Sequence, residues 1–379
     1  MEKQISKFLQ ERIDAGDFPS AVYLVAEKGE IVFHEALGYA VVEPERIEAK
    51  PDTIYDLASL TKVLVTGLLV AKLVEMKEAR LDDPASVESN SNLNGVTLES
   101  LLTHTSGLPA WKPFYLLVDE HSEVVSNILS NEISSEPKVL YSDLNSLLLE
   151  SLITSRLGWP LDHILRLEIC GPLGLAETGF NPNPKLQNRI AASEKGNQFE
   201  KQTCTELGYL DEKNPVAIAP GSDQLRDPQS AFRDYQIWGE VHDGNAYFMG
   251  GVAGHAGLFS TAEEVFKIAQ QFLPNYTTLL KPETCKLFRT NFTPGMNEHR
   301  SFAFQLASTP DSTAGTMMSP ESFGHLGFTG TSLWIDPVKD RVFILLTNRT
   351  HNRPLPFENI NSVRRRFHDL AIALLDKNS

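Results

Sequence analysis

Residues 59–77 read SLTKVLVTGLLVAKLVEMK and have the length of a helix that is apolar on nearly every face. Such a helix has to be enclosed by other elements, because apolar faces are unfavourable in water. The most apolar part, residues 63–74, is interrupted by Thr66, Gly67 and Lys72 and is shorter than a bilayer span, so no membrane span is expected. The chain must therefore build a globular core around this segment.

Predicted strands lie near both ends of the chain. Residues 21–40 predict a hairpin around a Lys28-Gly29 turn, and residues 331–348 predict a second one. Helices are expected outside the two hairpins, at residues 3–14 and 360–375. These elements predict an α+β fold, with an antiparallel sheet that is built from both chain ends and flanked by helices.

The middle of the chain is expected to be mainly helical. Helices are predicted at residues 97–108, 143–157 and 160–169, and another at residues 261–272. Residues 181–248 are rich in Asn, Pro, Gln and charge and show little periodicity, which predicts a long cleft-lining loop region. We expect a sheet domain of residues 1–58 and 249–379, an inserted helical domain of residues 59–248, and a cleft between them.

Composition limits the function. The chain has 49 acidic and 34 basic residues, a net charge of −15, which argues against nucleic-acid binding. The basic cluster 364–366 is interpreted as a solvated or salt-bridged helix face. Cys170, Cys204 and Cys285 match no disulfide or zinc pattern and are expected to be reduced. The N-terminus lacks a signal-peptide pattern, so a cytoplasmic location is predicted.

Ser59 and Lys62 open the apolar segment one helical turn apart. Serine is a poor nucleophile until a base removes its proton, and a neighbouring lysine can assist. Burial lowers the pKa of a lysine, which favours such a role. The alternative is a Lys62 side chain that points to solvent, and the S-x-x-K spacing by itself does not decide between the two.

Two further motifs follow in order along the chain. The stretch KVLYSDLNSLLLESL (138–152) places Tyr141 at the start of a helix, and HLGFTGTSLW (325–334) leads into the C-terminal hairpin. Read alone, Tyr141 is a half-buried aromatic residue at a helix start. With LLTHTSGL (101–108) and GPLGLAETGF (171–180), however, the ordered motifs resemble the penicillin-recognising serine hydrolases over about residues 5–375.

This superfamily includes class C β-lactamases, penicillin-binding peptidases and family VIII carboxylesterases. Residues 239–261, 324–337 and 363–369 are most similar to serine-type amidases that remove peptides from muropeptides. The resemblance implies a β-lactamase/transpeptidase-like fold and a covalent acyl-enzyme, without a cofactor.

The resemblance also implies roles for individual residues. Ser59 would be the nucleophile, and Lys62 and Tyr141 would share the work of the general base, with Tyr141 returning a proton to the leaving group. The backbone amides of Ser59 and Phe328 would form the oxyanion hole.

Three positions depart from the family pattern. Asp143 replaces an asparagine, and its carboxylate would raise the pKa of Lys62, which makes Tyr141 the preferred base. His325, followed by Gly327 in a substrate-binding strand, replaces a lysine and could supply a hydrogen bond or a pH-dependent positive charge. Leu326 replaces a threonine that holds the substrate carboxylate, so efficient β-lactam turnover is not expected.

Several other polar residues could belong to the site. His242 and Asp243 are predicted either to line the cleft and bind substrate or to build a local turn. His104 is expected to be structural. His242, His255 and His325 match no metal-binding spacing, so no metal is expected.

The sequence therefore predicts a serine hydrolase that acts on a small amide or ester, with a muropeptide-type amide as the specific hypothesis. The alternatives are a carboxylesterase of broad short-chain specificity, a β-lactamase or D,D-peptidase, and a non-catalytic binding protein on the same scaffold.

Overall fold

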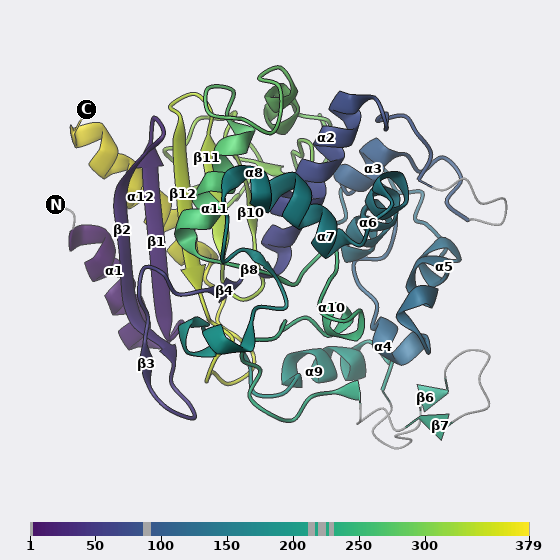
Figure 1. The fold of residues 1–379 in the computed structure, drawn as a ribbon, viewed down its shortest axis with the longest axis horizontal. Helices are drawn as coiled ribbons and strands as arrows, with labels where there is room; N and C mark the ends of the chain where they lie inside the picture. The colour runs from purple at the N-terminus through teal and green to yellow at the C-terminus, as the bar shows by residue number, and fades with distance from the viewer. Residues whose placement is uncertain (1–2, 86–91, 211–216, 219–224, 227–230, 379) are drawn as a thin grey trace.

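The computed structural model describes residues 3–85, 92–210, 217–218, 225–226 and 231–378. Its centre is a seven-stranded antiparallel sheet in the order β3-β2-β1-β12-β11-β10-β9 (Figure 1). The strands are β1 (Ser20–Glu27), β2 (Glu30–Val41), β3 (Ile47–Glu48), β9 (Gln305–Leu306), β10 (Phe323–Leu326), β11 (Ser332–Asp336) and β12 (Arg341–Thr347). The predicted α+β fold with a sheet from both chain ends is confirmed.

The two ends of the chain meet at the middle of the sheet. β1 pairs with β12 from Ala21 opposite Thr347 to Glu27 opposite Arg341. The last pair is reinforced by a 2.7 Å ion pair between Arg341 Nε and Glu27 Oε1. The chain reverses between β1 and β2 at Lys28 and Gly29, which both have positive φ, so the expected hairpin turn is present.

One face of the sheet is covered by the terminal helices α1 (Lys3–Ala15) and α12 (Asn361–Asn378), seen on the left of Figure 1. A smaller apolar core lies there and includes Ile5, Trp334 and Phe367. The C-terminal helix is thereby fixed against the strands that border the cleft described below.

The other face is covered by a larger layer of helices, seen on the right of Figure 1. Its members are α2 (Leu68–Met76), α3 (Leu98–Leu102), α4 (Phe114–Leu117), α5 (Val124–Leu129), α6 (Asp143–Leu157), α7 (Leu161–Leu165), α8 (Gly171–Leu173), α9 (Gln198–Glu206), α10 (Gly244–Phe248) and α11 (Ala262–Ala269). A three-stranded sheet of β4 (Tyr55–Asp56), β8 (Leu258–Ser260) and β5 (Gly179–Phe180) links this layer to the rest. The division into a sheet domain and an inserted helical domain stays a prediction.

The apolar segment is buried as expected, but it is not one regular helix. It begins with a 3₁₀ turn at Ala58–Leu60, continues as a π-helical stretch at Lys62–Gly67 and becomes α2 only at Leu68. Every residue of the π-helical stretch is buried. Such wide turns are frequent at functional sites, because they change the direction of side chains along a helix.

The region 181–248 contains more regular structure than its sequence predicts. Helix α9 was missed because only two of its residues, Glu200 and Cys204, are buried, so it lacks an apolar stripe. Helix α10 is one short turn. The strands β6 (Ala217–Ile218) and β7 (Leu225–Arg226) also lie here, and the rest of 211–230 falls outside the described residues. None of the described helices is long and apolar enough to cross a membrane.

Candidate active site

Ser59 lies in the 3₁₀ turn that precedes the buried helix. The preceding residue, Ala58, has a φ of 48°, in the left-handed region that a residue with a Cβ rarely adopts. The Asp56 carboxylate holds this backbone by accepting hydrogen bonds of 2.8 Å from the amides of Ala58 and His242. Strain of this kind costs about 1–3 kcal/mol and persists only where the surroundings enforce it.

Lys62 points inward, so a solvent-facing lysine is the wrong interpretation. Its side chain is 3% exposed. Its Nζ lies 2.8 Å from Ser59 Oγ, 2.8 Å from Asp143 Oδ1 and 2.9 Å from the carbonyl oxygen of His255. The contacts with Ser59 and His255 are hydrogen bonds that the ammonium donates, and the contact with Asp143 is an ion pair.

The charge of Lys62 follows from its neighbours. Burial lowers the pKa of Lys62, as the sequence predicts, but Asp143 and Tyr141 together raise it above the ordinary lysine value. The expectation of a lowered pKa is therefore wrong, and the expected effect of the carboxylate prevails. Lys62 is an ammonium at neutral pH.

Tyr141 lies directly before α6, and its ring faces two cations. Lys62 Nζ is 5.2 Å and Arg300 Cζ is 5.5 Å from the ring centroid. The hydroxyl is buried and has no hydrogen bond of ordinary geometry to the described residues, although Ser59 and Lys62 lie near enough to lower its pKa. Burial outweighs them and raises the pKa, so Tyr141 is a neutral phenol.

Ser142 and Asp143 stand at the start of α6. Ser142 occupies the N-cap position, but its hydroxyl donates to the Pro109 carbonyl and makes no capping bond. Asp143 is the first residue of α6, and its carboxylate pairs with Lys62. His104 accepts from the Ser142 amide at 3.1 Å, in keeping with the structural role expected for it.

His325 is neutral, so the expected pH-dependent positive charge is wrong. Its Nδ1 lies 2.9 Å from the carbonyl oxygen of Leu326 and donates to it, and its buried Nε2 has no partner among the described residues. Burial, Arg300 and Lys62 hold the pKa of His325 well below its usual value. Arg300 is the permanent cation at this place, and no motif in the sequence marks it.

The turn after β10 is tied to the backbone that carries Ser59. The hydroxyls of Thr329 and Thr331 donate to the carbonyl oxygens of Asp56 at 2.8 Å and Leu57 at 2.9 Å. Gly327 is required here, because a Cβ would lie 2.5 Å from the Leu57 oxygen. This contact places the segment that contains Phe328 beside the 3₁₀ turn of the serine.

His242 and Asp243 line the cavity and also build local structure, while their binding of substrate stays a prediction. His242 Nε2 lies 2.8 Å from Glu194 Oε2, and its ring stacks on Phe328. Asp243 caps α10 through the Ala246 amide, and its Oδ1 lies 2.9 Å from Nε2 of the neighbouring His255.

Three possible metal ligands, Asp143, Asp243 and His255, have ligand atoms within 4.8 Å of one another. This group differs from the histidines considered from the sequence, which were His242, His255 and His325. The ammonium of Lys62 lies 2.8 Å from Asp143 Oδ1 and would repel a divalent ion at the same carboxylate. The Asp143 carboxylate therefore suits the ammonium of Lys62 as a partner better than it suits a metal ion.

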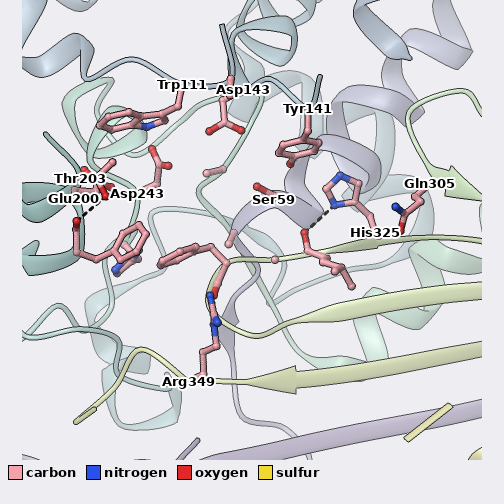
Figure 2. A pocket seen from close by; sticks show the side chains of 18 of the residues that line it. Ser59, Trp111, Tyr141, Asp143, Glu200, Thr203, Asp243, Gln305, His325 and Arg349 are labelled. Carbon is pink, nitrogen blue, oxygen red and sulfur yellow. Dashed lines mark hydrogen bonds between the residues drawn. The ribbon is translucent and has the colours of Figure 1, made fainter. Parts of the chain in front are cut away.

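Ser59 opens into a cavity of about 880 Å³. In Figure 2 the serine lies between a side that holds Asp243 and Glu200 and a side that holds His325 and Gln305. The lining also includes Trp111, Phe199, Thr203, Arg300, Phe328, Arg349 and Arg364. All residues that the sequence proposed for catalysis and substrate binding therefore lie on this one cavity or next to it.

Glu150 on α6 supports the loop behind the site and gives a test of the packing. Its Oε2 accepts from the Gly254 amide at 2.8 Å, and burial raises its pKa from 4.5 to about 7. The unfolded chain releases this proton at a lower pH than the folded chain, so the contribution of Glu150 to stability becomes less favourable as the pH rises from about 4.5 to 7.

Glu150→Gln keeps an acceptor for the Gly254 amide but has no proton to lose. We expect its melting temperature to exceed that of the wild type by several degrees at pH 8 and by clearly less at pH 5. Calorimetry at the two pH values measures the difference, and a difference that does not change with pH would contradict the assignment.

The chain is similar in sequence to known proteins. A family model described as Beta-lactamase matches residues 5–364. The "Putative D-alanyl-D-alanine carboxypeptidase" of Escherichia coli (strain K12) is 30% identical over an alignment that covers 92% of this chain and 82% of the relative.

Solved structures show the same fold. The octameric penicillin-binding protein homologue from Pyrococcus abyssi has a TM-score of 0.69 at 19% identity, covering 98% of this chain and 77% of that one. A class C beta lactamase from Rhodobacter sphaeroides has a TM-score of 0.69 at 17% identity, covering 98% and 99%. The chain belongs to the beta-lactamase family and is a serine hydrolase.

Proposed function

We propose that the chain cleaves an amide bond in a small peptide of the muropeptide type, through an acyl-enzyme on Ser59. The observation that carries the proposal is the position of Lys62 Nζ, 2.8 Å from both Ser59 Oγ and Asp143 Oδ1 at the wall of the cavity. This geometry brings together a nucleophile, a proton carrier and a proton acceptor, each within 2.8 Å of the next.

The charges decide the order of proton transfer. As Ser59 Oγ bonds to the substrate carbonyl carbon, its proton passes to Lys62 while Lys62 gives one to Asp143. Tyr141, as a neutral phenol, is better suited to donate than to accept, so of the two roles that the resemblance implies for it we assign it the return of a proton to the leaving group and not the role of preferred base. It protonates the leaving amine and regains its proton from Lys62, and water then releases the acyl group.

The negative charge on the substrate oxygen needs donors that are already in place. The amides of Ser59 and Phe328 are the proposed donors, because the contacts of Thr329 and Thr331 hold the two segments together. Each donor of this kind contributes roughly 10²- to 10³-fold to kcat in other hydrolases.

A peptide amide is favoured over other substrates by two observations. The relative from Escherichia coli that covers 92% of the chain is named for a D-alanyl-D-alanine carboxypeptidase reaction. Leu326 lines the cavity and has no hydroxyl to hold a substrate carboxylate, which disfavours a β-lactam; the carboxylate of a D-alanyl-D-alanine end would need another cation of the cavity lining, such as Arg300. A D,D-carboxypeptidase reaction on a muropeptide stem is one form of the proposed activity.

A substrate panel tests this proposal. The purified protein is incubated with a muropeptide carrying a D-alanyl-D-alanine end, with a short p-nitrophenyl ester and with a β-lactam. We expect the highest kcat/KM for the muropeptide. Ester hydrolysis without muropeptide cleavage would favour a carboxylesterase instead, and tight binding without any turnover would favour a binding protein.

Asp143→Asn tests the proton acceptor. Asparagine keeps a hydrogen-bonding oxygen for Lys62 but cannot take its proton, so Lys62 has to lose a proton to solvent before it can act. We expect the acid limb of the kcat/KM profile to move to higher pH and activity at pH 7 to fall by about 10²-fold.

Asp162→Asn is the matched control, since Asp162 forms a surface ion pair with Arg166 in the same helical layer. Its profile should match that of the wild type. An acid limb that stays in place in Asp143→Asn would show that the carboxylate does not receive the proton.

A further inference from the structure

Arg364 is a buried cation without a negative partner. The expectation that the cluster 364–366 is a solvated or salt-bridged helix face is wrong for this residue, because Arg364 is 5% exposed. In the described part of the chain it forms no ion pair, and burial together with Arg349 lowers its pKa to about 9. Since a buried unpaired charge is costly, its place in the fold needs a compensating role.

The guanidinium of Arg364 is directed at the turn after β10. Its Nη2 donates to the carbonyl oxygens of Gly327 and Thr331, both at 3.0 Å. Its Nη1 donates to Asn361 Oδ1 at 2.9 Å on the first turn of α12. The C-terminal helix thus holds a positive charge against two carbonyl groups of this turn.

The Gly327 carbonyl has a special position because it belongs to the same peptide group as the Phe328 N–H. A cation at the oxygen of a peptide draws electron density from its nitrogen, and this makes the N–H a stronger hydrogen-bond donor. The next peptide is fixed as well, because Arg349 Nε donates to the Phe328 carbonyl oxygen at 2.7 Å. Two arginines therefore set the orientation of both peptide planes at Phe328.

We propose that Arg364 is a positioning residue for the oxyanion hole: through the Gly327 carbonyl, it orients and polarises the Phe328 amide that receives the negative charge of the substrate oxygen. The proposal rests on the proposed function, in which this amide is a donor. Arg364 acts on the reaction through the peptide group and does not need to touch the substrate.

The test reads the hydrogen-bond strength in the oxyanion hole directly. A p-nitrophenyl ester with a ¹³C-labelled carbonyl is mixed with the protein, and the infrared band of the acyl-enzyme carbonyl is recorded by isotope difference. Stronger donors move this band to lower wavenumber. The same measurement is made on Arg364→Gln, on Arg364→Lys, and on Arg366→Gln as a control on an exposed arginine of the same helix.

In Arg364→Gln we expect the band to move to higher wavenumber, with kcat about 10-fold lower or more and KM within about threefold of wild type, as for a weakened oxyanion donor. Arg364→Lys should lie between the two, and Arg366→Gln should match the wild type. An unmoved band in Arg364→Gln would overturn the proposal. So would a large rise in KM at constant kcat, because that result indicates direct substrate binding.

A milder variant covers the case in which Arg364→Gln does not fold. Asn361→Ala removes only the acceptor that anchors Nη1, and we expect a smaller band shift in the same direction. No shift in a folded Asn361→Ala protein together with no shift in Arg364→Lys would also overturn the proposal. A wild-type protein that forms no acyl-enzyme would instead overturn the proposed function.

Discussion

Ser59→Ala is expected to lower kcat by roughly 10⁴- to 10⁶-fold, the range seen when the nucleophile of a serine hydrolase is removed. The reason is that, among the described residues, Ser59 supplies the hydroxyl that is hydrogen-bonded to Lys62 Nζ, at 2.8 Å, on the cavity wall. Covalent labelling by a fluorophosphonate should disappear completely. The measurement is turnover of the best substrate, together with intact mass after labelling.

The fold should survive this substitution. The Ser59 hydroxyl accepts one hydrogen bond from Lys62, and the turn itself is held by Asp56 and by Thr329 and Thr331 of the turn after β10. We expect a melting temperature close to that of the wild type. Ser155→Ala, at an exposed serine of α6, is the control and should keep full activity and labelling. Residual labelling of Ser59→Ala would point to a different nucleophile.

Lys62→Met is expected to lower kcat/KM by about 10²- to 10⁴-fold, the usual contribution of acid–base assistance. Methionine fills the buried space but cannot carry a proton from Ser59 to Asp143, which both lie 2.8 Å from Nζ. The loss should remain at high pH, because no deprotonation can restore the missing group. Steady-state kinetics across the pH range measure this effect.

Lys72→Met provides a matched control on the same buried helix. Lys72 is 17% exposed and pairs with Glu168 at 2.7 Å, away from the serine. It therefore reports the cost of removing a partly buried lysine and its ion pair from this helix without touching the cavity. If Lys62→Met lost no more activity than Lys72→Met, the proton-carrier role would be wrong.

The secondary structure and the motifs of the site could be predicted from the sequence more fully than the charge states of its residues. Hairpins and terminal helices have clear periodicity, so the sheet from both chain ends could be predicted. The motifs around Ser59, Tyr141 and His325 were recognisable because each is contiguous in the chain. Their convergence on one cavity follows from the fold that the motifs resemble.

The charge states could not be predicted, because they depend on neighbours from distant segments. A buried Lys62 was one of the two alternatives that the sequence allowed, but its pKa is raised by the added effects of Asp143 and Tyr141. His325 is kept neutral by burial and by Arg300, which no motif marks. Arg364 looked like part of a surface cluster because helical spacing alone does not show that its turn faces β10.

The central claim is a covalent acyl intermediate on Ser59, and mass spectrometry tests it most directly. The protein is mixed with an ester, a muropeptide or a β-lactam, quenched in acid within seconds and digested. We predict a mass increase equal to the acyl group on the peptide that contains Ser59, with the muropeptide or the ester, and none in Ser59→Ala. Turnover of these substrates with the adduct on another residue, or with no adduct under conditions that trap acyl-enzymes of known serine hydrolases, would contradict the account.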